Sequence, residues 1–217
     1  MSFRTALFDL DGTILDTLDD LFDATNATLA KFGMPPRTRM EVRSFVGHGI
    51  ANLITTSAPA GTDPALVQEM IAYFKEYYGA HCADKTCPFE GVLEMLRALR
   101  AKGIRTAVIS NKGDFAVQEL AKRYFDGLFD FVLGEKEPLP RKPAPDMVEY
   151  ALKQMGVTSE GAVYIGDSDA DVLTAKNAAL PCITVTWGFR DRDFLKQFGA
   201  DVIVDRVSDL QDLLLAP

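Results

Sequence analysis

A short apolar segment that ends in two closely spaced aspartates constrains the fold more than any other feature. Residues 5–8 (Thr-Ala-Leu-Phe) read as a buried strand, and Asp9-Leu10-Asp11-Gly12-Thr13 follows directly. Side chains alternate along a strand, so Asp9 and Asp11 leave the sheet on the same side. Two carboxylates held together repel each other unless a cation lies between them. The segment therefore indicates a functional sheet edge, with a plain strand and Asp-Gly turn as the alternative.

The rest of the chain alternates between apolar runs and helical patterns. The expected strands are residues 105–109, 131–133, 162–165, 182–185 and 202–204, and the expected helices are residues 92–101, 115–124, 145–155, 169–178 and 192–198. This alternation predicts an α/β fold with a doubly wound parallel sheet. Such sheets bind ligands beyond the carboxyl ends of their strands.

Residues 17–82 interrupt this alternation with helical patterns alone. Apolar residues recur at helical spacing over residues 18–32, which Gly33 and a Pro-Pro pair terminate, and again over residues 40–45 and 65–78. We expect no strand here. The pattern predicts a small helical domain of residues 16–85 inserted into a core of residues 1–15 and 86–217, with linkers near Asp16 and Pro88.

Composition excludes several classes of protein. The net charge of −8 and the pI of about 4.8 give no electrostatic footprint for nucleic acid or an anionic membrane. The apolar run before Asp9 is too short for a signal peptide, and no segment has the length of a membrane span. Three cysteines without a Cys-x-x-Cys pair indicate reduced thiols, so we expect a cytoplasmic protein. Two histidines are too few for a histidine-based metal cluster.

Polar residues also follow the later strands. Residues 110–112 (Ser-Asn-Lys) follow one strand, residues 166–171 (Gly-Asp-Ser-Asp-Ala-Asp) follow another, and Lys142-Pro143 lies between them. Each has an ordinary interpretation alone, because serine, asparagine and aspartate cap helices and a lone lysine is usually solvated. Their joint occurrence at one sheet edge favours a phosphate site.

These four motifs, Asp-x-Asp-Gly-Thr, Ser-Asn, Lys-Pro and Gly-Asp-Ser-x-x-x-Asp, together resemble the phosphatase branch of the haloacid dehalogenase superfamily. The resemblance covers nearly the whole chain and implies a Rossmann-like core in which the insert is a helical cap domain. Asp16-Thr17, Asn26 and residues 45–49 (Phe-Val-Gly-His-Gly) resemble the phosphoglycolate phosphatase group. The dehalogenase branch is disfavoured, since it lacks the acid/base at the position of Asp11.

The resemblance implies a role for each motif residue. Asp9 is the expected nucleophile, which carries a transient aspartyl phosphate, and Asp11 is the expected general acid and base. Lys142 neutralises charge on the phosphoryl group and on Asp9. Mg²⁺ is the implied cofactor, held by the carboxylates of Asp9 and Asp167 and the backbone carbonyl of Asp11. Asp171 is expected to orient a metal-bound water or Lys142.

The resemblance further implies a cradle for the phosphoryl oxygens. Thr13 and Ser110, with backbone N–H groups near Gly12 and Asn111, are its expected members. All of these residues lie at or just after the ends of expected strands.

Substrate choice is assigned to the cap. Gly47-His48-Gly49 is the candidate substrate-facing loop, since flanking glycines allow close backbone approach. His48 can hydrogen-bond a substrate carboxylate, or it can be a solvated residue of a surface turn. The expected partner is a small phosphorylated metabolite, with 2-phosphoglycolate as the first guess, and the expected state is a monomer or homodimer. A pyrophosphatase, a phosphosugar mutase and a non-catalytic phospho-ligand module remain alternatives.

Overall fold

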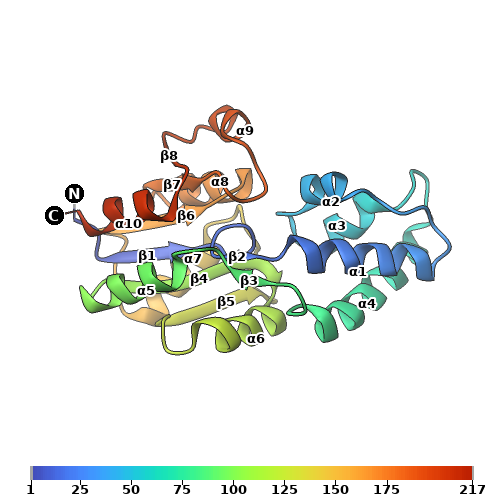
Figure 1. The fold of residues 1–217 in the computed structure, drawn as a ribbon, viewed down its shortest axis with the longest axis horizontal. Coiled ribbons are helices and arrows are strands. Elements are labelled where there is room, and N and C mark those ends of the chain that lie inside the picture. The colour runs from blue at the N-terminus through green and yellow to red at the C-terminus, as the bar shows by residue number, and fades with distance from the viewer. Residues whose placement is uncertain (1, 217) are drawn as a thin grey trace.

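The central sheet of the computed structural model, which describes residues 2–216, has six parallel strands in the order β5-β4-β1-β6-β7-β8 (Figure 1). The strands are β1 Thr5–Phe8, β4 Arg105–Gly113, β5 Phe131–Glu135, β6 Ala162–Gly166, β7 Cys182–Val185 and β8 Val202–Val204. The predicted doubly wound α/β fold is confirmed. Strand β4 is longer than expected, because it continues through residues 110–113 after an irregularity in its pairing with β5.

Helices cover both faces of this sheet. The core helices are α5 Val92–Ala101, α6 Asp114–Phe125, α7 Asp146–Met155, α8 Asp169–Asn177, α9 Arg192–Gln197 and α10 Val207–Leu215. Strand β1 is fully buried, and its alternate side chains face opposite layers. Leu7 packs with α7 and α8, whereas Ala6 and Phe8 pack with α5, α6 and α10. Sequence analysis missed α10, whose Leu210 and Leu214 complete the second layer.

The insert forms a group of four helices beside the sheet (Figure 1). They are α1 Leu18–Lys31, α2 Arg39–Phe45, α3 Gly49–Ser57 and α4 Pro64–His81, and residues 17–82 contain no strand, as predicted. We call this group the cap. Sequence analysis missed α3. The first turn of α2 is held by a capping box between Thr38 and Glu41.

Two short connections join the cap to the core. At the predicted linkers, β2 (Leu15–Asp16) pairs antiparallel with β3 (Cys87–Pro88). The buried carboxylate of Asp20 in α1 accepts hydrogen bonds from the backbone N–H groups of Lys85 and Thr86 and from the Thr86 hydroxyl. These contacts fix the returning linker against the first cap helix. No helix within residues 2–216 combines the length and apolar character that a membrane span requires.

Candidate active site

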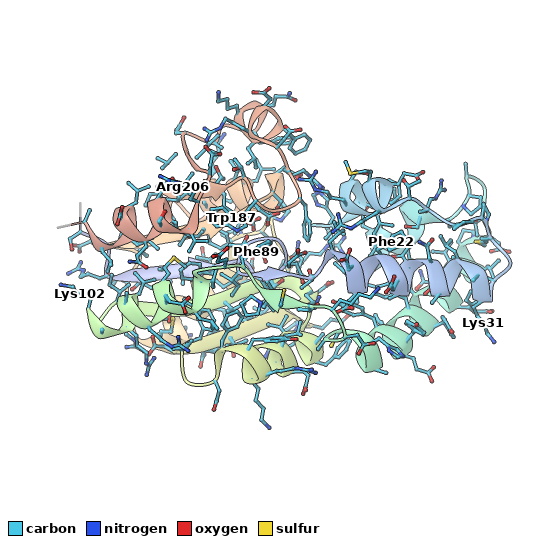
Figure 2. The ribbon with its side chains drawn as sticks, viewed as in Figure 1. Phe22, Lys31, Phe89, Lys102, Trp187 and Arg206 are labelled. Carbon is cyan, nitrogen blue, oxygen red and sulfur yellow. The ribbon has the colours of Figure 1, made fainter. Side chains whose placement is uncertain are left out.

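A pocket lies between the carboxyl ends of the central strands and the cap. Asp9, Asp11, Asp167 and Ser110 line its core side, whereas the cap contributes mainly apolar side chains and the glycines of the 47–49 loop. The side chains between the two parts are drawn in Figure 2, where Trp187 and Phe89 lie near one another on the core side. The strand ends thus bring the predicted carboxylates into one enclosed space.

Asp9 follows β1 directly and is 7 % exposed. Its Oδ1 lies 2.9 Å from Nζ of Lys142 and forms no hydrogen bond of good geometry. Burial raises the pKa of Asp9 to about 7. The charge of Lys142 lowers this pKa, but the charges of Asp171 and Asp11 oppose that effect. A cation beside this carboxylate would relieve that cost and keep it ionised.

Lys142 is held in place by a buried polar network. Its Nζ lies 2.7 Å from Asp171 Oδ1 and 3.0 Å from the Tyr164 hydroxyl. Burial lowers the pKa of Lys142, but the charges of Asp171 and Asp9 outweigh burial and leave it well above its usual value. The lysine is therefore a fixed positive charge beside Asp9. Asp171 supports this lysine, and its Oδ2 accepts hydrogen bonds from the backbone N–H groups of Asp167 and Ser168 and from the Ser168 hydroxyl.

Asp167 is fully buried at the end of β6. It accepts hydrogen bonds from the Thr13 hydroxyl at 3.0 Å and from the Phe189 N–H at 2.7 Å. Burial raises the pKa of Asp167 well above its usual value, and the charges of Asp171 and Asp9 raise it further. Gly12 has φ +82°, and a Cβ there would lie 2.5 Å from Asp167 Oδ2, so only glycine fits.

The carboxylates fit a small divalent cation. Oxygens of Asp9, Asp167 and Asp171 lie within 4.8 Å of one another, all three residues are buried, and one oxygen of Asp9 has no hydrogen-bond partner. The two oxygens of Asp171 together accept five hydrogen bonds, whereas each oxygen of Asp167 accepts one, so Asp9 and Asp167 are the better ligands. An oxygen-only donor set of this kind suits Mg²⁺.

The predicted phosphoryl cradle is partly occupied by internal contacts. The Thr13 hydroxyl donates to Asp167, and the N–H of Gly12 bonds to the Leu15 carbonyl at 2.9 Å. The Asn111 amide bonds to the Lys142 backbone and to the Gly47 carbonyl. Ser110 lines the pocket. Phosphoryl contacts of these residues stay predictions, and in this structure the Thr13 hydroxyl donates to the Asp167 carboxylate.

The 47–49 loop reaches the pocket through its two glycines. Gly47 and Gly49 line the pocket, whereas Nε2 of His48 lies 3.1 Å from Asp169 Oδ2. Burial opposes ionisation of Asp169, but the hydrogen bond from His48 and the charges of His48 and Arg190 outweigh burial and lower the pKa of Asp169. The His48 side chain is thus partly exposed and contacts the core at the pocket rim. Substrate contacts of this loop stay predictions.

The sequence patterns assigned no role to two residues of this region. Lys112 and Tyr78 line the pocket beside Asp11. The position of Lys112 just after Ser-Asn, at a strand end, is the signal that could have revealed it. Residues 187–190 also follow an expected strand end, from which the sequence allows them to approach the site. The structure places Phe189 in the pocket wall, and Arg190 donates hydrogen bonds to three cap carbonyls near the end of α2, those of residues 43, 44 and 46.

Comparisons with known proteins agree with this geometry. The model of the family described as haloacid dehalogenase-like hydrolase matches residues 6–185. A phosphoglycolate phosphatase of Thiobacillus denitrificans is 31 % identical over 216 residues, covering 96 % of this chain and 94 % of its own. Pyrophosphatase PpaX of Listeria monocytogenes serotype 4a is 32 % identical over 209 residues, covering 95 % of this chain and 94 % of its own.

A solved structure extends the likeness to three dimensions. It is that of a candidate phosphoglycolate phosphatase from Lactobacillus delbrueckii subsp. bulgaricus, with a TM-score of 0.95, 39 % identity and full coverage of both chains. The family match, the relatives and the strand-end carboxylates agree. The chain is therefore a phosphatase that belongs to the haloacid dehalogenase-like hydrolase family.

Proposed function

We propose that this phosphatase hydrolyses a small phosphate monoester through an aspartyl phosphate on Asp9. The observation that carries the proposal is the pairing of a buried, pocket-lining carboxylate with a fixed lysine charge, Asp9 with Lys142 at 2.9 Å. A buried carboxylate without a hydrogen bond on one oxygen is poorly solvated, which suits a nucleophile. Asp11 and Asp167 line the same pocket, where the reaction needs an acid/base and a metal ligand.

The reaction divides into two steps. An oxygen of Asp9 attacks phosphorus while the bond to the ester oxygen breaks, and Asp11 gives its proton to that leaving oxygen. Water then attacks phosphorus, the bond to Asp9 breaks, and Asp11 accepts the proton of the water. Lys142 opposes negative charge on the phosphoryl group throughout, and Asp171 holds Lys142 in position. Such positioning and charge stabilisation supply most of the acceleration of phosphoryl transfer.

Mg²⁺ is the metal that we propose for this site. Asp9 and Asp167, with the backbone carbonyl of Asp11, would hold it, and it would neutralise charge on the phosphoryl oxygens. Their buried carboxylates, whose pKa values are raised without a cation, support this assignment.

We infer that the substrate is small, with 2-phosphoglycolate as the first to test. The cap side chains in the pocket wall are mainly apolar, namely Leu21, Val46, Ile50 and Leu53, and they close over the carboxylates. A wall of this kind excludes water from the reacting groups and leaves room for a short leaving group. The phosphoglycolate phosphatase relative supports this choice.

Pyrophosphate is a second candidate. The ammonium group of Lys112 lies in the pocket beside Asp11 and offers a positive charge near the leaving group. The relative named as a pyrophosphatase supports this alternative, and it is 32 % identical to this chain, against 31 % for the phosphoglycolate phosphatase. The two candidates share an anionic leaving group.

The test is phosphate release from 2-phosphoglycolate, pyrophosphate, sugar phosphates and nucleotides, each with Mg²⁺ or with EDTA, for the unaltered enzyme and Asp9→Asn. We expect metal-dependent release, strongest for one small substrate, and a loss of at least about 10⁴-fold in the variant, as for the removal of other nucleophiles. Tight binding of phosphate without turnover would instead favour a non-catalytic module. Interconversion of sugar phosphates without net release would favour a mutase.

A further inference from the structure

Asp11 is held by Lys112, a residue outside the four motifs, which also contacts Tyr78 of the cap. Nζ of Lys112, at the end of β4, lies 2.8 Å from Asp11 Oδ1 and donates a second hydrogen bond to the Tyr78 hydroxyl. Tyr78 belongs to the last part of α4 in the cap, and Nζ also lies 4.5 Å from the centre of its ring. A core lysine therefore joins the predicted acid/base to a cap helix.

This contact is buried on all sides. The side chains of Lys112 and Asp11 are 3 % and 13 % exposed, and Tyr78 is fully buried. Burial lowers the pKa of Lys112, but the charges of Asp11 and Tyr78 and the hydrogen bonds to both outweigh burial and raise it overall. The ammonium group of Lys112 offers only hydrogen-bond donors, and it directs two of them to the Asp11 carboxylate and the Tyr78 hydroxyl.

The geometry leaves one oxygen of Asp11 for chemistry. Within residues 2–216, Oδ1 accepts from Lys112 while Oδ2 accepts no hydrogen bond. An aspartate turns freely about its last torsion unless a partner fixes it. One anchored oxygen thus sets the direction in which the other faces the pocket.

We propose that Lys112 and Tyr78 are positioning residues for Asp11. Lys112 fixes the carboxyl group so that its free oxygen meets the leaving oxygen, and Tyr78 makes this arrangement depend on the cap resting on the core. The inference rests on the proposed role of Asp11 as acid and base. Asp11 gives its proton when the ester bond breaks and regains one from water, while Lys112 exchanges none.

An ion pair that serves only stability would also bury these groups. The dependence of the rate on the leaving group distinguishes such a structural role from the positioning of Asp11. An alkyl phosphate needs a proton from Asp11, whereas p-nitrophenyl phosphate expels a stable phenolate without one. Acid–base catalysis contributes about 10²- to 10⁴-fold. Hydrolysis of the aspartyl phosphate also uses Asp11 and is common to both esters, so the first step is followed alone, as release of the leaving group in a single turnover. We therefore expect Lys112→Met to slow this release from the best alkyl phosphate by about tenfold or more, and to slow release of p-nitrophenolate by less than about threefold.

Tyr78→Phe keeps the packed ring and removes only the hydroxyl. Tyr78→Phe should also slow the reaction of the alkyl phosphate more than that of p-nitrophenyl phosphate, by a smaller factor than Lys112→Met. Arg43→Met is the matched control, because Arg43 also joins the cap to the core, through a 2.8 Å hydrogen bond to the Gly188 carbonyl, without touching Asp11. This control should slow both esters by the same factor.

A double variant keeps the test independent of any loss of stability. If Lys112 acts through Asp11, then Lys112→Met should cause no further selective loss in an Asp11→Asn background. Equal loss on the two esters, or an undiminished effect of Lys112→Met in that background, would overturn the inference while leaving the proposed function intact. Absence of metal-dependent turnover by the unaltered enzyme would contradict the proposed function and this inference with it.

Discussion

The two walls of the pocket differ in kind. On the core side, Asp167 and Asp171 are buried and bonded through both of their oxygens, and Lys142 is bonded to the groups around it. On the cap side, Leu21 and Ile50 present apolar surface. The core wall is a fixed set of charges suited to chemistry, whereas the cap wall provides shape and excludes water.

The contacts between the walls rely on backbone acceptors. Core side chains donate to backbone carbonyls of the cap, as Arg190 does to Val46 and Asn111 does to Gly47. Arg43 of the cap donates in turn to the Gly188 carbonyl of the core. A backbone carbonyl is present whatever side chain its residue carries. The comparison therefore teaches that several contacts between the walls depend on the sequence of one wall only.

The largest effect is expected where the core wall is most constrained. Asp171→Asn removes the charge that holds Lys142 at 2.7 Å, inside a fully buried site. Breaking a buried ion pair lowers the free energy of unfolding by about 3–5 kcal/mol. In a chain of this size, each kcal/mol lost lowers the melting temperature by about 2–4 °C. Turnover should fall by at least about 10²-fold with the loss of one positioned charge.

Calorimetry and steady-state kinetics measure both effects. Asp205→Asn is the control, because it lies on an exposed ion pair with Arg192. That variant should change both quantities little. Normal stability and turnover for Asp171→Asn would show that the core wall is less constrained than the comparison holds.

The second prediction concerns the contact between the walls. Arg190→Lys retains a positive charge but cannot donate to the three carbonyls near the end of α2. Each lost hydrogen bond costs about 0.5–1.5 kcal/mol, so kcat/KM should fall by about tenfold or more through poorer cap closure. An unchanged kcat/KM, with the fold intact by circular dichroism, would remove Arg190 from the account.

The third prediction uses pH on the metal-free enzyme. The pKa of Asp9 is raised from 3.8 to about 7 in the folded protein, so the folded state binds the proton more tightly than the unfolded state does. The resulting stabilisation is complete at low pH and is lost as pH rises between about 4 and 7. With EDTA the melting temperature should fall across that window relative to Asp9→Asn, and Mg²⁺ should restore it at pH 7.

Melting curves at stepped pH values, with Mg²⁺ and with EDTA, give the comparison. The Asp9→Asn variant without metal should be more stable than the unaltered protein at pH 7. The repulsion argument fails if that variant melts lower without metal, or if Mg²⁺ has no effect on the unaltered protein.

The smallest effect is expected at the cap rim. The His48 side chain is 39 % exposed and contacts Asp169 rather than the pocket. Pairs of this exposure contribute about 0–1 kcal/mol, so His48→Gln should change kcat/KM for 2-phosphoglycolate by less than about fivefold. A loss confined to substrates with a carboxylate would return His48 to the substrate-binding role that the sequence suggested.

The core was predictable because its signals are local. Asp9 and Asp167 each follow an apolar strand directly, and parallel strands bring their carboxyl ends to one edge, so the two carboxylates could be placed together from the sequence. The helical insert was likewise visible from its periodicity. Helix α3 was not, because it begins at Gly49, two residues after Gly47, and includes β-branched residues that weaken a helical signal.

The residues that the cap contributes to the site could not be predicted from local sequence patterns. Tyr78 repeats at helical spacing with Phe74 and stacks on it at 5.4 Å, so its pattern is that of a core residue. Its hydroxyl meets Lys112 only because the cap rests on β4. Similarly, nothing in the pattern around Thr13 reveals that its hydroxyl faces Asp167. Contacts between distant segments depend on how the two parts pack, which short-range patterns do not encode.

The measurement that tests the central claim most directly is the capture of the intermediate on the core wall. Asp11→Asn treated with Mg²⁺ and p-nitrophenyl phosphate should form the aspartyl phosphate without needing an acid and hydrolyse it slowly without a base. After acid quench and digestion, mass spectrometry should find one phosphoryl group on Asp9, and none when Asp9 is also Asn. Phosphorylation of another residue, or rapid turnover that leaves Asp9 unmodified under every quench time, would contradict the account.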